Sequence, residues 1–547
     1  MTMFGLMQEN DLMISSLIRY AAENHGSVEI VTRAEDGDIH HRYTYKEAEA
    51  RCKRLACALI SQLDIKKGDR VGTLGWSTYR HFELFYGVSG MGAVLHTINP
   101  RLFDDQVSYI INHAEDRVLF VDVDFVPLVE RLLSDLSCVE KIIVLTDQAQ
   151  MPETSLDDVL SYEGLLASVE AESDYHWPTF DERSASSLCY TSGTTGNPKG
   201  VLYSHRSTII HALSASQNSA FGLSVYETIM PISPMYHANG WGLPYIAPML
   251  GAKLVLPASK LDGEHIHQLI ESEKVTFACA VPTLFSMLFQ YLEESGKKVE
   301  ALQRTMIGGS AVPKAMSKKF LDVYGVTVLQ IWGMTETSPL GVISSPTPQV
   351  DALSPVEKEE VMYKQGRIQF GLEVKIIDEQ GNLVPRDGVS FGDLWVKGSW
   401  VTSCYYKNEG GGFLDQDGWF PTGDVVTIDQ YGFMKITDRA KDVIKSGGEW
   451  ISSIDIENLA VAHEKVLQAG VVGIYHPKWE ERPILVIRLV AGQTMVASEM
   501  HDFLKDKIAK WWMPDAIFFV DEIPLTATGK IKKTTLREIY KDCLRDQ

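Results

Sequence analysis

The sequence predicts an α/β fold, with a large N-terminal domain of layered α/β sheets, a small β-rich subdomain and an α+β C-terminal domain. Apolar, β-rich runs alternate with amphipathic helical patterns through most of the chain, which is typical of sheets covered by helices. After about residue 365, short alternating strands separated by Gly, Asp and Asn take over, and a compact α+β pattern follows residues 439–445. These two changes divide the chain.

The N-terminal region is expected to form largely parallel sheets. Apolar runs at 70–76, 81–98, 117–123 and 141–147 have the character of buried strands. Residues 45–63 place apolar side chains on one face at helical spacing and charges on the other, which predicts an amphipathic helix. Strands that are separated by helices of this length usually pair in parallel.

The domain boundaries are placed where the pattern changes. We expect the large domain at residues 1–438, with its β-rich subdomain at about 365–438. The C-terminal domain is expected at 442–547, which leaves 439–441 as the connection. Gly, Asp and Asn between the short strands of the subdomain indicate hairpins.

Charge and cysteine content restrict the function classes. The 547 residues include 51 Lys and Arg against 72 Asp and Glu, for a formal net charge of −21. Such a balance argues against a protein that coats nucleic acid, because Lys and Arg must neutralise the phosphates. The seven scattered cysteines predict no disulfide framework, and no apolar run reaches the roughly 18 residues of a membrane span. We expect a cytoplasmic protein with small-molecule partners, no nucleic acid and no membrane span.

The strongest local motif is Y-T-S-G-T-T-G-N-P-K-G at 190–200. Its hydroxyl and glycine residues could present hydroxyls and backbone N–H groups to phosphate oxygens, and Lys199 would add a positive charge. It is not a Walker A motif, because the chain contains no G-x-x-x-x-G-K-[ST]. A solvent-exposed linker of the same composition remains the alternative.

Four further motifs place polar residues at strand ends or in turns. They are Q-I-W-G-M-T-E-T at 330–337, G-W-F-P-T-G-D at 418–424, D-R-A-K-D-V-I-K-S-G-G-E at 438–449 and P-L-T-A-T-G-K at 524–530. Glu336 could hold Mg²⁺, which prefers oxygen ligands, and Asp424 could accept hydrogen bonds from ribose hydroxyls. Each motif taken alone has another explanation. These are a helix cap for 330–337, an Asx-turn for 418–424, a hinge for 438–449 and a solvated charge run for 524–530.

In this order, the five motifs resemble those of the acyl-adenylate-forming superfamily of acyl-CoA synthetases, luciferases and peptide-synthetase adenylation domains. The matching segments span residues 190–532. The stretches W-G-M-T-E-T and S-G-G-E-W-I-S-S look most like medium-chain-type acyl-CoA ligases. Within these, the whole chain is similar to the bacterial 3-methylmercaptopropionyl-CoA ligases of dimethylsulfoniopropionate breakdown.

The resemblance implies residues for ATP, which lie in the first four motifs and at 309–311 and 436. The phosphates would lie against Thr191, Ser192, Gly193, Thr194, Thr195 and Lys199. The adenine would lie against Gly309, Ser310, Ala311, Gln330, Trp332, Gly333, Met334 and Thr335. Asp424, Ile436 and Arg439 would contact the ribose and the nearby phosphate, and Thr194 and Glu336 would hold Mg²⁺.

The resemblance also implies sites for the acyl group and CoA. The acyl pocket is expected at His237, Trp241, Gly309 and Trp332, although His237 could equally be a core histidine bonded to a backbone carbonyl. The bulk of Trp241 and Trp332 favours a small acyl group. CoA is expected at Lys445, Ser446, Gly447, Gly448 and Glu449, whereas Trp450, where Asn is common, has no evident role.

The implied reaction has two steps, with Lys530, Glu336 and His237 as the catalytic candidates. A carboxylate and ATP would give acyl-AMP and pyrophosphate, with Lys530 bridging the carboxylate and the α-phosphate, and CoA would then displace AMP. A mobile C-terminal domain would turn about Lys441 between the steps. The resemblance further implies Mg²⁺ and a homodimer. The alternatives are a stand-alone adenylation enzyme that loads a carrier protein, and a non-catalytic sensor of acyl groups or nucleotides.

Overall fold

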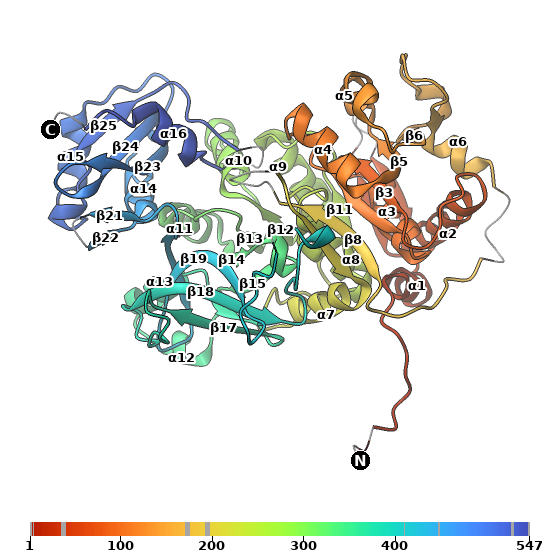
Figure 1. Ribbon diagram of the computed structural model, residues 1–547, viewed down its shortest axis with the longest axis horizontal. Coiled ribbons are helices and arrows are strands. Elements are labelled where there is room, and N and C mark those ends of the chain that lie inside the picture. The colour runs from red at the N-terminus through yellow and green to blue at the C-terminus, as the bar shows by residue number, and fades with distance from the viewer. Residues whose placement is uncertain are drawn as a thin grey trace. The chain divides into compact units, whose positions relative to one another are not determined.

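The computed structural model describes residues 3, 5–33, 40–169, 175–191, 197–409, 411–446, 449–526 and 530–544 (Figure 1). The chain forms two compact units, and each is built from three separate stretches of sequence. The first unit comprises Met1–Cys279, Met334–Leu340 and Ser399–Gly412. The second comprises Ala280–Gly333, Gly341–Gly398 and Phe413–Gln547.

The first unit contains a seven-stranded sheet in the order β7-β6-β5-β3-β4-β8-β9. Its strands are β3 (Arg70–Leu74), β4 (Val94–Thr97), β5 (Asp116–Val121), β6 (Lys141–Val144), β7 (Leu160–Ser161), β8 (Ala185–Tyr190) and β9 (Gly200–Ser204). Every neighbouring pair is parallel except β8 and β9, which are antiparallel. The largely parallel sheet expected from the alternation of strands and helices is therefore confirmed.

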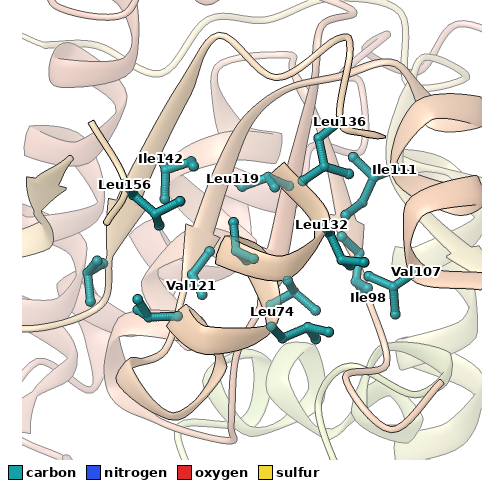
Figure 2. Close-up of a cluster of buried hydrophobic side chains, with 14 of the residues drawn as sticks. Leu74, Ile98, Val107, Ile111, Leu119, Val121, Leu132, Leu136, Ile142 and Leu156 are labelled. Carbon is teal, nitrogen blue, oxygen red and sulfur yellow. The ribbon is translucent and has the colours of Figure 1, made fainter. Parts of the chain in front are cut away.

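One face of this sheet packs against α4 (Asp104–Ala114) and α5 (Val126–Leu132). Figure 2 shows the buried aliphatic side chains between them, with Val107 and Ile111 of α4 and Leu132 of α5 near strand residues such as Leu119. Burying side chains of this size stabilises the fold by about 1.5–3 kcal/mol each. This layer places α4 beside the sheet.

The remaining helices of this part are α1 (Ile14–Asn24), α2 (Tyr45–Ser61), α3 (Tyr79–Gly90) and α6 (Tyr162–Ala167). The predicted helix at 45–63 is confirmed as α2, which begins where the Thr44 hydroxyl accepts the Glu47 N–H and the Glu47 carboxylate accepts the Thr44 N–H. The strand expected over 81–98 is wrong in its first half, because α3 occupies those positions. Nearly all of α3 is buried, and a helix buried on every side loses the polar face that marks helical periodicity.

A second sheet in the first unit has the order β2-β1-β11-β10-β12. Its strands are β1 (Glu29–Thr32), β2 (His41–Thr44), β10 (Thr228–Pro231), β11 (Lys253–Leu256) and β12 (Phe277–Ala280). The helices α7 (His205–Ser216), α8 (Leu243–Leu250) and α9 (Gly263–Glu273) accompany it. Among the described residues, no helix combines the length and apolar character that crossing a membrane requires.

The second unit begins with α10 (Pro282–Ser295), β13 (Arg304–Ile307), α11 (Lys314–Tyr324) and β14 (Thr327–Gly333), in which the two strands are parallel. The short antiparallel pair β15 (Leu340–Ile343) and β16 (Arg367–Ile368) flanks α12 (Pro348–Asp351) and α13 (Pro355–Met362). The hairpins predicted after residue 365 are confirmed as an antiparallel sheet of β17 (Leu372–Ile377), β18 (Phe391–Gly398), β19 (Phe420–Ile428) and β20 (Met434–Arg439).

The last part of the second unit is α+β, as predicted. Its strands are β21 (Ile444–Ser446), β22 (Glu449–Ile451), β23 (Val466–His476), β24 (Glu480–Leu489) and β25 (Ala516–Phe519), and its helices are α14 (Ser453–Val461), α15 (Ala497–Leu504) and α16 (Lys533–Tyr540). Val471 and Leu485 belong to one buried cluster, whereas Val472 and Ile484 belong to another. Because successive strand residues point to opposite faces, the central strands are covered on both sides.

Candidate functional site

The predicted site residues are divided between the two units. The first unit holds Thr191, Lys199, His237, Trp241, Met334, Thr335 and Glu336. The second holds Gly309, Ser310, Ala311, Gln330, Trp332, Gly333, Asp424, Ile436, Arg439, Lys441, Lys445, Ser446, Glu449 and Lys530. Ser192, Gly193, Thr194, Thr195, Gly447 and Gly448 lie outside the described residues.

The two sides of the predicted phosphate-binding motif lie next to each other. Tyr190 at the end of β8 is the register partner of Gly200 at the start of β9. The Thr191 N–H donates to the Lys199 carbonyl at 2.9 Å, and the Lys199 N–H donates to Thr191 Oγ1 at 3.3 Å. The motif therefore starts at the carboxyl end of a buried strand, where α/β sheets usually bind ligands.

Glu336 is held in a buried position by the segment 399–412. It belongs to the 3₁₀ turn η6 (Thr335–Thr337) and is only 7% exposed. The Tyr405 hydroxyl donates to Glu336 Oε1 at 2.7 Å, and the Thr402 N–H donates to the Glu336 carbonyl at 2.8 Å. Burial raises the pKa of Tyr405 above its ordinary value, so this hydroxyl keeps its proton and acts as a donor.

Lys199 joins this group through the same tyrosine. Its ammonium lies 4.9 Å from the centroid of the Tyr405 ring, within the range of a cation–π contact. Lys199 and Glu336 are thus brought to one side chain, Tyr405, which the sequence did not indicate as functional. A cation and a buried carboxylate in this arrangement suit a phosphate ligand together with its counter-ion.

The donor set fits Mg²⁺ that is held mainly by a substrate. Among the described residues, no three His, Cys, Asp or Glu side chains gather into a cluster that could bind a metal ion alone. Glu336 supplies one carboxylate, and Mg²⁺ commonly binds through one or two carboxylates, substrate phosphates and waters. The other predicted ligand, Thr194, lies outside the described residues.

Several residues that sequence reasoning missed hold the chain on either side of Glu336. The Tyr203 hydroxyl donates to the Thr335 carbonyl at 2.7 Å, and Trp400 Nε1 donates to the Leu340 carbonyl at 2.9 Å. The Leu340 N–H donates to His211 Nε2 at 3.3 Å. Burial lowers the pKa of His211 to about 3, so the ring is neutral and Nε2 is an acceptor. No local motif marks these side chains, because their partners are distant in sequence.

Trp241 belongs to a left-handed turn that His237 directly precedes. Five consecutive residues, Ala238–Gly242, have φ between 37° and 80°, and only two of them are glycines. A non-glycine residue in this conformation costs about 1–2 kcal/mol. Asn239 stabilises the turn, because its Oδ1 accepts from the Thr97 hydroxyl at 3.2 Å and its Nδ2 donates to Ser187 Oγ at 2.6 Å. Strain of this kind is concentrated at functional sites.

In the second unit, Asp424 is contacted by two other predicted residues, Trp332 and Arg439. This carboxylate is 2% exposed, and it accepts a hydrogen bond from Trp332 Nε1 at 2.9 Å through Oδ2. Arg439 Nε lies 2.9 Å from Oδ1, and the two residues are register partners on β19 and β20. Burial raises the pKa of Asp424, whereas the charges of Arg439 and Lys530 and the hydrogen bond from Trp332 act in the opposite direction.

The neighbouring predicted adenine residues are held by backbone contacts. The Gln330 N–H donates to Ser344 Oγ at 2.7 Å, and its side-chain amide donates to the Tyr363 carbonyl at 3.1 Å. Gly341 allows Trp332 its position, because a Cβ there would lie 2.3 Å from the indole ring. Gly309 has φ +81°, in the region that favours glycine.

Lys445, one of the predicted CoA residues, lies beside Trp450, which now has a structural role. The Lys445 ammonium lies 5.0 Å from the centroid of the Trp450 ring and 3.1 Å from Glu379 Oε1. The Trp450 ring in turn packs against Phe391 at 4.9 Å. Ser446 Oγ accepts from Arg482 at 3.1 Å. The Trp450 ring therefore helps to position the side chain of Lys445.

The similarity to known proteins extends over nearly the whole chain. The model of the AMP-binding enzyme family matches residues 18–406, and that of the AMP-binding enzyme C-terminal domain matches 455–530. The 3-methylmercaptopropionyl-CoA ligase of Ruegeria lacuscaerulensis is 46% identical over 542 residues, which cover 99% of this chain and 100% of the relative. The medium-chain-fatty-acid–CoA ligase of Ectopseudomonas oleovorans is 44% identical and covers 99% and 98%.

The crystal structure of the anthranilate CoA ligase AuaEII in complex with anthranoyl-AMP is similar in fold. Its TM-score is 0.85 at 24% identity, with 97% of this chain and 98% of that chain covered. The mixed α/β architecture predicted from the sequence is thereby confirmed.

Proposed function

Because the chain belongs to the AMP-binding enzyme family, we propose that it is an ATP-dependent acyl-CoA ligase. The observation that carries the proposal is the full-length similarity to two named CoA ligases at 44–46% identity. A carboxylate and ATP form acyl-AMP and pyrophosphate, and the thiol of CoA then displaces AMP. The two groups of residues about Glu336 and Asp424 support this reaction.

The first step needs charge neutralisation rather than a general base. A carboxylate is already a nucleophile, and its obstacle is repulsion by the triphosphate. Lys199 and Lys530 supply positive charge, and preorganised charges of this kind are worth about 10²–10³ in rate each. Bound Mg²⁺ would neutralise phosphate charge, and Glu336, oriented by the Tyr405 hydroxyl, is the residue that would hold it.

Asp424 and its neighbours are proposed to bind the nucleoside. Buried acceptors such as Asp424 Oδ1 and Oδ2 suit a pair of ribose hydroxyls, and the Trp332 and Arg439 contacts fix their orientation. Adenine is proposed to lie beside the Trp332 ring. These roles, like those of Gly309–Ala311 and Ile436, are proposals.

For the second step we propose rotation about Lys441, with domains at 1–438 and 442–547. Lys445 and Ser446 would then contact CoA. The ion pair between Lys445 and Glu379 is exposed and opposes the release of the ammonium only weakly, since such pairs contribute about 0–1 kcal/mol. His237, at the start of the strained turn, would face the carboxylate end of the acyl group.

The proposed substrate is 3-methylmercaptopropionate or another short or medium-chain carboxylate. The two relatives named for CoA ligation act, by their names, on 3-methylmercaptopropionate and on medium-chain fatty acids. Trp241 and Trp332 are both bulky and buried, which favours a short pocket. A cytoplasmic location, expected from the scattered cysteines, and a homodimer, implied by the resemblance, are also proposed.

A carboxylate panel tests the proposal. Acetate to octanoate and 3-methylmercaptopropionate are supplied with ATP and Mg²⁺, and AMP release is followed with and without CoA. We expect CoA-dependent AMP release that is greatest for a short or medium-chain acid. AMP release without dependence on CoA would favour a carrier-loading enzyme, and ATP binding without any AMP release would favour a sensor.

A further inference from the structure

A half-buried cluster of aromatic, imidazole and carboxylate groups lies beside the phosphate-binding motif of the first unit. Tyr109 and His113 of α4 are four residues apart, so they share one helix face, and their rings stack at 5.3 Å and 14°. His113 Nδ1 lies 2.6 Å from the Tyr190 hydroxyl, and its Nε2 lies 3.2 Å from Glu409 Oε1. The Tyr109 hydroxyl donates to the same Oε1 at 3.1 Å.

The chemistry of these groups fixes the direction of the hydrogen bonds. Burial raises the pKa of Tyr190 and lowers that of His113, so a protonated phenol faces a neutral imidazole. The Tyr190 hydroxyl therefore donates to Nδ1, which assigns the remaining ring proton to Nε2 and lets it donate to Glu409. Glu409 thus receives one hydrogen bond from His113 and one from Tyr109.

The cluster contacts both sides of the phosphate-binding motif. Tyr190 is the last residue of β8 and directly precedes Thr191. On the other side, Gly200 at the start of β9 lies next to Tyr406, whose ring packs against His113. The cluster therefore borders the motif at both of its ends.

The same cluster reaches the segment that holds Glu336. Glu409 directly follows the 3₁₀ turn η7 (Tyr406–Asn408) and lies four residues beyond Tyr405 in the chain. The Tyr406 ring packs edge-on against His113 at 5.7 Å and 88°. Gly200 leaves room for this packing, because a Cβ there would lie 3.0 Å from the Tyr406 Cβ. Lys407 and Glu115, which follows α4, form an ion pair at 2.6 Å.

We propose that Tyr109, His113 and Glu409 are positioning residues that hold the phosphate-binding motif and the Glu336-binding segment in register for ATP. The inference rests on the proposed ligase function. It assigns the three side chains no contact with substrate. Their loss loosens Tyr190 and Tyr406 and thereby weakens ATP binding, while the sites for the carboxylate and CoA keep their affinity.

The variants Tyr109→Phe and Glu409→Gln test this role in the full-length protein. Tyr109→Phe keeps the ring stack and removes only the hydroxyl that donates to Glu409. The matched control is Tyr79→Phe, because the Tyr79 hydroxyl also donates to a glutamate, Glu163 Oε1, at 3.1 Å in the same unit. KM for ATP, carboxylate and CoA is measured in the coupled reaction, and the Kd for ATP by calorimetry.

We expect KM and Kd for ATP to rise about tenfold in both variants, equivalent to about 1.4 kcal/mol. KM for the carboxylate and for CoA should stay unchanged, as should every constant of Tyr79→Phe. His113→Gln, which keeps a side-chain donor and acceptor, should bind ATP more tightly than His113→Ala. A merely structural role would instead lower the amount of active enzyme and the melting temperature with all KM values unchanged.

Two results would overturn the inference. One is an unchanged Kd for ATP in Tyr109→Phe and Glu409→Gln, and the other is a loss that falls equally on all three substrates. If the wild-type chain binds ATP but ligates no carboxylate, the ligase proposal fails while the Kd comparison still decides the positioning role. If it binds no ATP, both fail together.

Discussion

Replacing Tyr405 by Phe isolates the single hydrogen bond that orients Glu336. The substitution removes the hydroxyl that donates to Glu336 Oε1 at 2.7 Å and keeps the ring that lies beneath the Lys199 ammonium. A hydrogen bond to a charged group contributes about 1.5–3 kcal/mol. Since Tyr405 is only half-buried and water can replace part of the bond, we expect the lower value.

The expected consequence of Tyr405→Phe is a loss of about 1.5 kcal/mol, or roughly tenfold, in kcat/KM for ATP in acyl-AMP formation. The assay follows pyrophosphate release at several Mg²⁺ concentrations, because a poorly oriented Glu336 should also raise the Mg²⁺ requirement. Tyr405→Leu serves as the comparison, since it removes the ring from Lys199 as well and should lose more. Wild-type kinetics in Tyr405→Phe, or equal losses in the two variants, would refute the reasoning.

Three further predictions test other parts of the site. Lys530→Ala should slow acyl-AMP formation by about 10²–10³ and spare thioester formation from supplied acyl-AMP; equal losses in both half-reactions would remove the role assigned to Lys530. Lys441→Pro, which fixes φ, should affect the thioester step most, and unchanged CoA turnover would contradict rotation about this residue. Burial lowers the pKa of His211 from 6.5 to about 3, so below pH 6.5 the unfolded chain binds a proton that the folded chain excludes. His211 therefore destabilises the fold as the pH falls from 6.5 towards 3, by up to about 1.4 kcal/mol per pH unit. Urea unfolding between pH 7 and 4 should show a shallower pH dependence in His211→Gln, and identical slopes would disprove the assignment.

The fold was predictable where the signal is local. Helix α2 has both a polar face and a capping box, and the hairpins of β17–β20 are separated by turn residues, so short windows of sequence identify them. Helix α3 was mistaken for a strand because its nearly complete burial removes that contrast. Hydrophobic periodicity shows which face of an element is exposed to solvent, so an element that is buried on every side has no such periodicity.

The site was predictable in its motif residues but not in their supports. Trp332, Asp424, Arg439 and Lys530 belong to recognisable motifs. The structure places Trp332 and Arg439 in contact with Asp424, and the charge of Lys530 acts to lower the pKa of Asp424, which burial raises. Tyr405 acts on Glu336 from a segment far away in the sequence, and nothing in its own neighbourhood identifies it.

The left-handed turn was missed for a related reason. Gly240 and Gly242 are the only local signals within Ala238–Gly242, and three other residues adopt the same conformation. They do so because Asn239 is held by Thr97 and Ser187, which belong to two strands of another part of the unit. Contacts of this kind are fixed only once the fold is complete.

The way the first unit is assembled from three stretches also bears on how the protein is made. Its last stretch, Ser399–Gly412, is synthesised after the whole of Ala280–Gly398, which belongs chiefly to the second unit. At about 5–20 residues per second, the ribosome adds a delay on the order of ten seconds between Cys279 and Gly412. During that interval the nascent chain lacks Thr402 and Tyr405, which hydrogen-bond to Glu336 in the finished protein. A fragment that ends at Cys279 therefore lacks two stretches of the first unit, whereas one that extends to Gly412 contains every stretch of it.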